Sequence, residues 1–388
     1  MSSELPPWLR QRLLATGGSV PFVTYMEWVL HDPQHGAYGS GRLQIGPRGD
    51  FVTAPSLGAD FAALVARQLV AWLEALPPSR PERLSLVETG PGEGQLARDL
   101  AEWIAAARPE LAQRLELVLV EPNPGMAERQ RLQLQSCPLP TRWASFADLA
   151  AAPVTGVVLA HEVLDALAVE RIVADGALWR RQMVTLHGDS LRLEPGEPLE
   201  PSELAQLVPL GLAEPGLQRP SGWCSEWHPG LEPWLRDCAG ALRCGQLLVI
   251  DYALEAWRYY APQRSNGTLL AYRAQQASAD PLQEPGAWDL TAHLCLQSLQ
   301  LAAADSGWRP LGQCRQGQAL LALGLAERLH RLQQQPELGL EQLLQRREAL
   351  LRLVDPAALG DFRWVAFSRG LEADSALPPL FAREPQNT

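Results

Sequence analysis

The stretch that most constrains the fold is residues 84–95, which read L-S-L-V-E-T-G-P-G-E-G-Q. A short apolar run is followed by an acidic residue and then by glycines at alternate positions. From Leu96 onward apolar residues recur at helical spacing, so the glycines lie where a buried strand ends and a helix begins. Glycine suits such a turn because a residue without a Cβ lets the backbone turn sharply and approach a ligand closely. The pattern predicts a nucleotide-binding turn in an α/β fold.

The spacing of the glycines separates two classes of nucleotide. Gly90, Gly92 and Gly94 alternate as G-x-G-x-G, whereas dinucleotide-binding folds carry G-x-G-x-x-G. Class I methyltransferases carry E/D-x-G-x-G-x-G, and Glu88 stands at the acidic position, so the stretch favours S-adenosylmethionine over NAD. The structural alternative is an ordinary strand-to-helix turn, because one glycine-rich turn is a short motif.

Two further carboxylates follow strands expected in the same half of the chain. Residues 115–120 form a second apolar run that ends in Glu121, and a carboxylate at this position accepts hydrogen bonds from a ribose diol. Asp148 follows an expected short strand at 143–146, where such folds often contact the adenine amino group. We therefore expect the cofactor to be bound by Glu88, Gly90, Gly92, Gly94, Glu121 and Asp148.

Residues 1–80 precede the glycine turn and are more than a minimal nucleotide-binding fold needs, so we expect them to form an N-terminal helical arm and lid. Residues 36–49 hold five glycines and lead into G-D-F-V-T-A-P at 49–55. This composition predicts a mobile loop that ends in an ordered strap. The loop is either a lid over the cofactor or a tolerated surface loop. If it is a lid, the candidate cofactor contacts are Gly49, Asp50, Phe51 and Thr53.

A second polar cluster follows the apolar run at 156–160, where the chain reads H-E-V-L-D-A-L from residue 161. Ligands bind at the carboxyl ends of strands in open α/β sheets, so a substrate would meet the cofactor here. Glu162 and Asp165 are three residues apart, and a helix beginning at this point would present both carboxylates on one face. We take them as the candidate catalytic pair. Asp165 could instead cap the helix, and for His161 we prefer a buried structural role.

The rest of the chain completes the expected domain organisation. Residues 81–168 form the cofactor-binding half of the core, and residues 169–230 form an inserted β-hairpin and proline-rich segment. Residues 231–388 supply the remainder of the core and the C-terminal helices. Within that part we expect a buried strand at 247–252, a capped helix from Asp289, and a last, antiparallel strand at 362–367.

Composition limits the partners and cofactors that we expect. The net charge of -11 argues against nucleic acid as the main partner, because phosphate binding depends on clustered basic residues, and suits a cationic side chain or basic segment. The six cysteines show no C-x-x-C pair, so we expect reduced thiols and no metal. The N-terminus lacks a basic, apolar leader and no apolar run approaches membrane-spanning length, so we expect a cytoplasmic protein without membrane contact. Homo-oligomers remain possible.

Several motifs together resemble the MidA-type S-adenosylmethionine-dependent methyltransferases, which include a mitochondrial arginine methyltransferase that serves respiratory complex I assembly. The resemblance spans roughly residues 20–370. It rests on Y-M-E-W-V-L-H-D-P-Q-H-G-A-Y, I-G-P-R-G-D-F-V-T-A-P, V-E-T-G-P-G-E-G, A-H-E-V-L-D-A-L-A-V, D-P-L-Q-E-P-G-A-W-D-L-T-A-H and L-G-D-F-R-W-V-A-F. Ser56 and Ala168 stand where the family usually has glutamate and proline.

The resemblance implies a class I methyltransferase fold, with a Rossmann-like sheet that is mostly parallel and has an antiparallel last strand. It also implies S-adenosylmethionine at the glycines and Glu121, and methylation of an arginine in a partner protein. Glu162 and Asp165 would then orient the guanidinium through charge-assisted hydrogen bonds. Two alternatives stay open from the residues: a small-molecule methyltransferase, and an assembly chaperone that binds the cofactor without turnover.

Overall fold

A seven-stranded sheet forms the centre of the molecule, with strand order β16-β17-β10-β5-β2-β3-β4. The structure is a computed structural model that describes residues 5–43, 45–46, 49–50, 52–76, 83–216, 218–334, 339–372 and 376–382. The strands are β2 (Leu84–Thr89), β3 (Leu115–Val120), β4 (Thr141–Trp143), β5 (Val154–His161), β10 (Leu242–Asp251), β16 (Arg309–Arg315) and β17 (Arg363–Arg369). Every neighbouring pair is parallel except those made by β17, which is antiparallel to β10 and β16. The predicted class I sheet is therefore confirmed.

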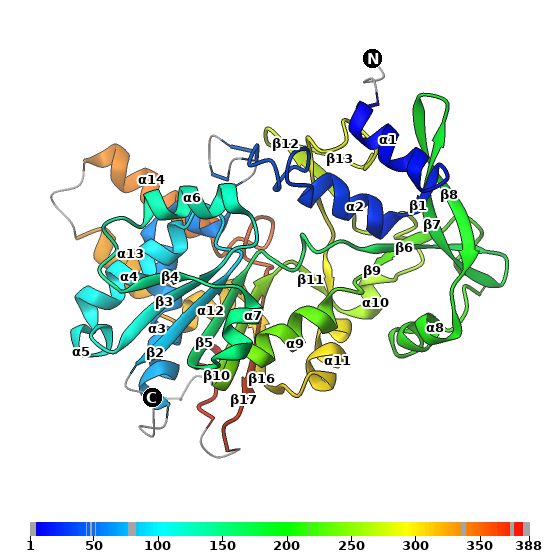
Figure 1. The fold of residues 1–388 in the computed structure, drawn as a ribbon. Helices are drawn as coiled ribbons and strands as arrows, with labels where there is room; N and C mark the ends of the chain where they lie inside the picture. Colours follow the sequence, from blue (N-terminus) through cyan, green and yellow to red (C-terminus); the bar gives the residue numbers. More distant parts are fainter. Residues whose placement is uncertain are drawn as a thin grey trace.

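The central strands are buried on both faces, which explains why they read as continuous apolar runs. Alternate residues of each strand pack on opposite layers: Leu86 belongs to one hydrophobic cluster and its neighbour Val87 to the other. The first layer contains α3 (Ala59–Ala75), α4 (Gln95–Ala107), α12 (Gln316–Ala322), α13 (Leu325–Leu332) and α14 (Leu340–Arg352). The second contains α7 (Phe146–Ala151), α9 (Leu231–Ala241) and α11 (Leu296–Asp305), as Figure 1 shows.

A second sheet holds the inserted region and the N-terminal segment together. It pairs β1 (Ser19–Pro21), β7 (Leu178–His187), β6 (Glu170–Asp175) and β9 (Cys224–Trp227) in that order, with β8 (Ser190–Pro198) on β7. The helices α1 (Pro7–Ala15) and α2 (Phe22–His31) lie against it (Figure 1). The hydrophobic residues of these helices share one buried cluster with Val169 and Val184. The N-terminal helices are thus packed on the insertion.

Smaller elements complete the described chain. A three-stranded sheet has the order β13 (Gln276–Ser278), β12 (Leu270–Arg273), β14 (Asp289–Thr291), and β11 (Ala253–Leu254) pairs with β15 (Leu294–Cys295). The remaining helices are α5 (Pro109–Ala112), α6 (Pro124–Gln133), α8 (Pro201–Leu207), α10 (Ala256–Tyr259) and the 3-10 turns η1 (Ala54–Leu57), η2 (Val208–Leu210) and η4 (Leu380–Ala382). Over the described ranges, no helix combines the length and the apolar character that crossing a bilayer requires.

Two helices expected from the sequence are not formed. The helix expected from Asp289 is wrong, because residues 289–291 pair antiparallel with β12 and α11 begins only at Leu296. The helix expected to begin after the apolar run at 156–160 is also wrong: residues 162–168 form bends, a turn and irregular backbone, and Glu162 has φ +52°. Long-range pairing and hydrogen bonding override the local preference in both places.

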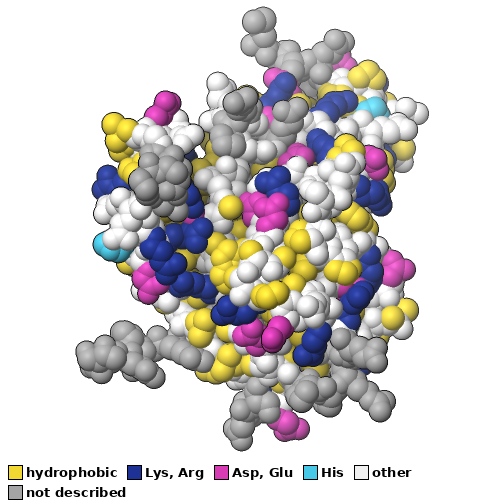
Figure 2. Space-filling view, turned by 90° about the vertical axis from the view of Figure 1, so that its left-hand side faces the viewer, with side chains coloured by type: hydrophobic (Ala, Val, Ile, Leu, Met, Phe, Trp, Pro, Cys, Tyr) yellow, Lys and Arg dark blue, Asp and Glu magenta, His cyan; other side chains and the backbone are white. Residues whose placement is uncertain are grey.

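The side of the molecule that carries α4, α5, α13 and α14 has a mixed surface. Figure 2 shows basic, acidic and hydrophobic side chains interspersed across this face. Several basic side chains here are in ion pairs, such as Arg98 with Glu102 and Arg331 with Glu327. Paired, interspersed charges of this kind fit an ordinary solvated surface.

Close contact between β2 and β5 gives a first prediction. An added Cβ at Gly156 would lie 1.8 Å from the backbone oxygen of Ser85, so Gly156→Ala forces two central strands apart. We expect the free energy of unfolding to fall by about 3 kcal/mol, measured by chemical denaturation. Gly339→Ala is the matched control, because no atom lies within 4 Å of a Cβ there. Equal stability of the two variants would contradict the prediction.

Candidate functional site

A cavity of about 960 Å³ opens at the carboxyl ends of β2, β3 and β5. Its walls come from residues 88–93 after β2, residues 120–124 after β3, and residues 161–163 after β5. Segments between residues 38 and 58 cover it from the other side. Ligands bind at this edge of open α/β sheets because the loops that leave parallel strands converge there.

The glycine turn lies on the cavity wall as the sequence predicts. Gly90 and Gly92 line the cavity at φ +56° and +54°, a left-handed conformation that residues with a Cβ rarely adopt. A Cβ on Gly92 would lie 2.9 Å from Cδ1 of Ile45, so the turn also leaves room for the segment above it. Gly94 instead is the N-cap of α4 and packs against Gln130. A backbone of this shape lets a ligand come close to the turn.

Glu88 contributes a carboxyl group at the end of β2. Its side chain lines the cavity, and burial raises its pKa to about 8. Its Oε2 atom is buried and has no hydrogen-bond partner among the described residues. Buried polar atoms are normally paired, so an unpaired oxygen facing a cavity indicates a donor supplied by a ligand.

Glu121 is held rigidly at the end of β3. The backbone N–H of Asn123 donates to its Oε1 at 2.9 Å, and Nε2 of Gln130 donates to its Oε2 at 2.9 Å. Burial raises the pKa of this carboxyl, and the two hydrogen bonds oppose the shift. Gln130 also donates to the backbone oxygen of Gly92 at 2.8 Å and accepts from Trp143 at 2.9 Å.

Gln130 is therefore a residue of the site that the sequence reasoning missed. It is fully buried on α6 and connects the glycine turn to Glu121. The available signal was a glutamine on the inward face of a helix that follows the Asn-Pro cap at 123–124.

Asp148 lies at the rim of the cavity, on the first turn of α7. Its Oδ2 accepts from the backbone N–H and from the hydroxyl of Ser145, at 2.9 Å and 2.7 Å. These hydrogen bonds lower the pKa of Asp148, so it is ionised at neutral pH. Trp143 and Phe146 also line the cavity, and each offers an aromatic surface against which a flat ring could pack.

The N-terminal segment covers the glycine turn and is fastened to α6. Asn123 donates through its side chain to the backbone oxygen of Tyr38, and Arg129 donates to the backbone oxygens of Gly41 and Leu43 at 3.1 Å and 3.4 Å. Nε of Arg129 also lies 3.3 Å from a carboxylate oxygen of Glu93.

The candidate cofactor contacts in the segment 49–55 do not all lie at the cavity. Thr53 lines the cavity. The N–H of Thr53 donates to the hydroxyl of Ser56 at 3.1 Å, and this hydrogen bond closes a turn. Asp50 binds the β12–β13 turn, where its carboxylate accepts from the N–H of Ala274 at 3.0 Å. The N–H of Gly49 donates to the oxygen of Gly46. Phe51 lies outside the described residues.

At the end of β5, Glu162 occupies the far end of the cavity. Its side chain is buried, and its Oε1 atom lies 3.4 Å from Nε2 of His161. This Oε1 atom has no hydrogen-bond partner in the described chain. Burial, followed by the charges of Asp165 and Asp251, raises its pKa well above the ordinary value. A left-handed conformation in a non-glycine residue costs of order 1 kcal/mol, and such strain is concentrated at functional sites.

Asp165 is placed differently from the sequence expectation, whereas His161 is buried as expected. His161 was expected to be buried and structural; it is buried, but it also lines the cavity, and burial lowers its pKa to about 3, which keeps the ring neutral. The carboxyl of Asp165 accepts from its own N–H and that of Ala166, and Asp165 is not among the cavity-lining residues that the structure describes. Glu162 and Asp165 are thus close in space without sharing a helix face.

Comparison with known proteins agrees with this geometry. A family model described as "Putative S-adenosyl-L-methionine-dependent methyltransferase" matches residues 64–314. A Burkholderia thailandensis protein crystallised with S-adenosyl-homocysteine superimposes with a TM-score of 0.84 and 29% identity, covering 96% of this chain and 93% of that one. A second crystal structure of a protein from the same organism gives a TM-score of 0.80 and 27% identity, covering 96% and 94%.

Sequence relatives point in the same direction. The Drosophila melanogaster protein named "Protein arginine methyltransferase NDUFAF7 homolog, mitochondrial" is 27% identical over 95% of this chain and 86% of its own length. The Xenopus tropicalis protein named "Protein arginine methyltransferase NDUFAF7, mitochondrial" is 38% identical over 20% of this chain and 18% of its own length.

The cofactor is S-adenosylmethionine, and the residues present fit it. Glu88 offers a buried oxygen without a partner in the described chain, and Glu121 lies where a ribose diol is expected. Gly90 and Gly92 leave the backbone accessible. The volume lies at the upper end of the range typical of cofactor pockets, about 300–1,000 Å³.

We predict that Gly92→Val blocks the cofactor. The substitution adds a β-branched side chain at positive φ and against Ile45, so the affinity for S-adenosylhomocysteine should fall by about two orders of magnitude or more, or about 3 kcal/mol. Titration calorimetry measures this, with Gly339→Val as the control at an open position. Unchanged affinity, or tighter binding of NAD by the native protein, would contradict the assignment.

We also predict that the cofactor protects the covering segment. Residues 36–55 should exchange amide hydrogens more slowly when S-adenosylhomocysteine is bound, because Ile45 and Thr53 lie on the cavity wall. Hydrogen exchange with mass spectrometry measures this, and α8, which contributes no lining residue, serves as an internal control. Identical exchange with and without the ligand would leave only the surface-loop interpretation.

Proposed function

This chain belongs to the family of S-adenosyl-L-methionine-dependent methyltransferases whose model it matches, and from that premise we propose that it methylates an arginine side chain of a partner protein. The observation that carries the proposal is the carboxyl group of Glu162. It is buried at the end of β5, lines the cavity, and keeps one oxygen without a hydrogen-bond partner among the described residues.

The charges around Glu162 support a cationic acceptor. Asp165, Asp251 and Asp289 are all buried and close enough to raise its pKa. Among the described residues, no arginine forms an ion pair with any of these four carboxyls, although 33 basic residues occur in the chain. Buried charges are normally paired, so the site favours a cation that arrives with the acceptor.

A guanidinium matches this site better than a simple ammonium does. It is planar and presents its donors in a fixed fork, which lets carboxylates bind it from defined directions. Binding one nitrogen to a carboxylate orients the group and leaves another nitrogen directed at the cofactor. Positioning of this kind accounts for most of the rate when the electrophile is already activated.

Bound S-adenosylmethionine supplies a methyl group that is activated by its positive sulfonium. Glu162 holds the acceptor nitrogen, and its raised pKa makes it able to take the proton that the nitrogen loses on methylation. His161, neutral and 3.4 Å away, stays next to that carboxyl throughout. The cavity-lining residues between Tyr38 and Ser56 lie over the site, where they would limit the access of water to the reaction.

The names of relatives support a protein acceptor, since the NDUFAF7 proteins are named protein arginine methyltransferases. By the family resemblance, the partner would be a subunit of a respiratory complex I-like assembly. A small-molecule methyltransferase and a chaperone without turnover are the alternatives. A strain that carries Gly92→Val separates turnover from chaperoning, because a chaperone acting without the cofactor would still support assembly.

The acceptor can be identified directly. Mass spectrometry of proteins from a strain that lacks this chain, compared with its parent, should show the loss of methylation at one or a few arginines. Loss of a methylated small molecule with no change in protein methylation would favour the small-molecule alternative.

Glu162→Gln should separate acceptor binding from cofactor binding. The substitution keeps the shape but removes the charge and a charge-assisted hydrogen bond, so methyl transfer should fall by about one to two orders of magnitude. Affinity for S-adenosylhomocysteine should stay nearly unchanged. The assay is transfer of labelled methyl groups to the identified partner, and Glu128→Gln, an exposed residue, is the matched control. Full activity of Glu162→Gln would reject the proposed role.

A further inference from the structure

The hydrogen bonds of the buried carboxyls divide them into two kinds. Asp251 accepts from the backbone N–H groups of Leu164, Asp165 and Tyr252, at 2.9, 3.3 and 2.8 Å. Asp165 accepts from backbone N–H groups of its own turn. By contrast, Oε1 of Glu162 and Oδ1 of Asp289 are buried without a hydrogen-bond partner in the described part of the chain. Of these carboxyls only Glu162 lines the cavity, and Asp289, like Asp165 and Asp251, is not among the lining residues that the structure describes. The acceptor atoms left without a partner are therefore Oε1 of Glu162, on the cavity wall, and Oδ1 of Asp289, behind it.

Asp289 is held beside the Glu162 loop by several bonds. It lies on β14, and the hydroxyl of Tyr38, a cavity-lining residue, donates to its carboxyl. Three residues further on, the N–H of Ala292 donates to the backbone oxygen of Asp165 at 3.1 Å. The charge of Asp289 also raises the pKa of Glu162. These contacts place the β14 carboxyl next to the end of β5 although the two segments are far apart in the sequence.

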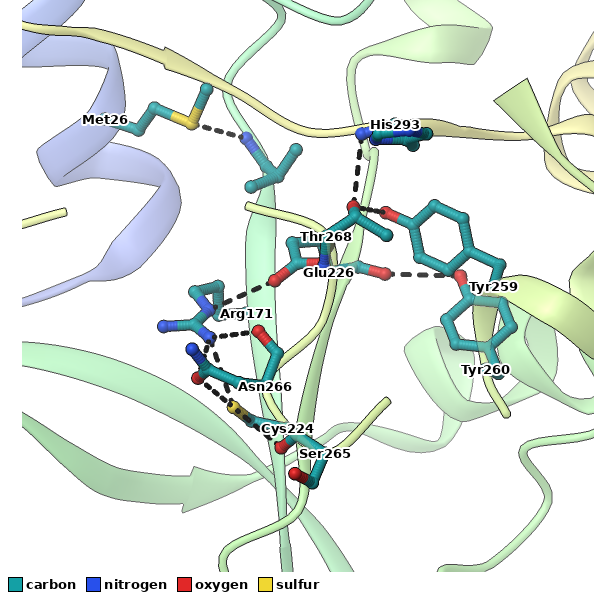
Figure 3. A network of polar contacts seen from close by, with 11 residues as sticks. Met26, Arg171, Cys224, Glu226, Tyr259, Tyr260, Ser265, Asn266, Thr268 and His293 are labelled. Carbon is teal, nitrogen blue, oxygen red and sulfur yellow. Dashed lines mark hydrogen bonds and ion pairs between the residues drawn. The ribbon is translucent and has the colours of Figure 1, made fainter. Parts of the chain in front are cut away.

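A buried polar network fixes both ends of the segment that carries Asp289 (Figure 3). Thr268, just before β12, donates through its N–H to Glu226 at 2.7 Å, and the N–H of His293, just after β14, donates to the Thr268 hydroxyl at 3.1 Å. Nε of Arg171 in turn lies 3.4 Å from the Glu226 carboxylate. Residues that are anchored in this way can present a side chain precisely.

We propose that Asp289 and Glu162 form the two arms of the acceptor clamp, so that Asp289 takes the place that the sequence pattern gave to Asp165. This inference rests on the proposed arginine methyltransferase function and names a further residue that contacts its acceptor. The two carboxyls come from different segments, the turn after β5 and the strand β14, and a guanidinium can donate to one carboxylate from each of two edges.

The proposal has a pH signature. Burial, followed by the charge of Asp165, raises the pKa of Asp289 to about 8, so without an acceptor the group is mostly protonated at neutral pH. A cation favours the ionised form, so binding releases protons and affinity rises with pH. The part of this rise that Asp289 contributes levels off above about pH 8, and Glu162, whose pKa is also raised, contributes its own part. The titratable groups that face Asp289 are Tyr38 and Asp50 of the covering segment, Glu162 and Asp165 after β5, and Tyr272 of β12.

The test is calorimetric titration of the full protein, loaded with S-adenosylhomocysteine, with methylguanidinium as the probe. Titrations between pH 6 and 9, in buffers of different ionisation enthalpy, give the affinity and the number of protons released. Asp289→Asn should weaken binding about tenfold or more and release fewer protons, because one charge-assisted bond and one titrating group are lost. Asp305→Asn, an exposed change of the same charge, is the matched control and should behave as the native protein.

A third variant separates direct contact from an effect on the covering segment. Tyr38→Phe removes the phenol–carboxyl bond but keeps the Asp289 charge, so proton release should stay close to native even if affinity falls. If Tyr38→Phe and Asp289→Asn lose affinity and proton release to the same extent, direct contact between Asp289 and the acceptor is overturned. Native behaviour of Asp289→Asn would overturn the inference and leave the arginine proposal standing. Failure of the loaded native protein to bind methylguanidinium at all would instead reject the arginine acceptor, and the clamp with it.

Discussion

The acceptor end of the site depends on the buried carboxyl of Asp251 at the end of β10. It accepts three backbone N–H groups, two of them from the turn that follows β5. Without that acceptor, the turn would leave buried donors unpaired, at a cost of about 1–3 kcal/mol each. By holding the backbone of residues 164 and 165, Asp251 allows Glu162 to adopt a positive φ and to point into the cavity. Asp251, which is not among the cavity-lining residues that the structure describes, therefore helps to determine where the candidate catalytic carboxyl of Glu162 lies.

The two ends of the cavity recognise their ligands in different ways. At the cofactor end, Gly90 and Gly92 expose backbone, and the carboxyls of Glu88 and Glu121 occupy strand ends. At the end proposed for the acceptor, Glu162 lines the cavity and three further buried carboxyls lie near it, with no arginine paired to any of the four among the described residues. The first arrangement suits a ligand with many neutral hydrogen-bonding groups, and the second suits a cation.

Short-range sequence patterns were sufficient to predict the cofactor end of the cavity and insufficient to find the residues that we propose for the acceptor. The strands β2, β3 and β5 and the glycine turn could be predicted because each is a continuous segment with its own apolar period or glycine spacing. Asp289 could not be predicted, because its position depends on pairing between β12 and β14 and on the bond to Tyr38, more than two hundred residues earlier. Gln130 was missed for a similar reason: its three partners come from β3, the glycine turn and Trp143.

A continuous set of hydrogen bonds nevertheless joins the two halves. Gln130 binds both the Gly92 backbone and Glu121, the N–H of Asn123 binds Glu121, and the Asn123 side chain binds the Tyr38 backbone. The Tyr38 hydroxyl then reaches Asp289. Tyr38 belongs to the covering segment, so Asp289 has its phenol partner only while that segment lies over the glycine turn. If Asp289 binds the acceptor as proposed, the covering segment is a structural part of the acceptor site as well as a cover for the cofactor.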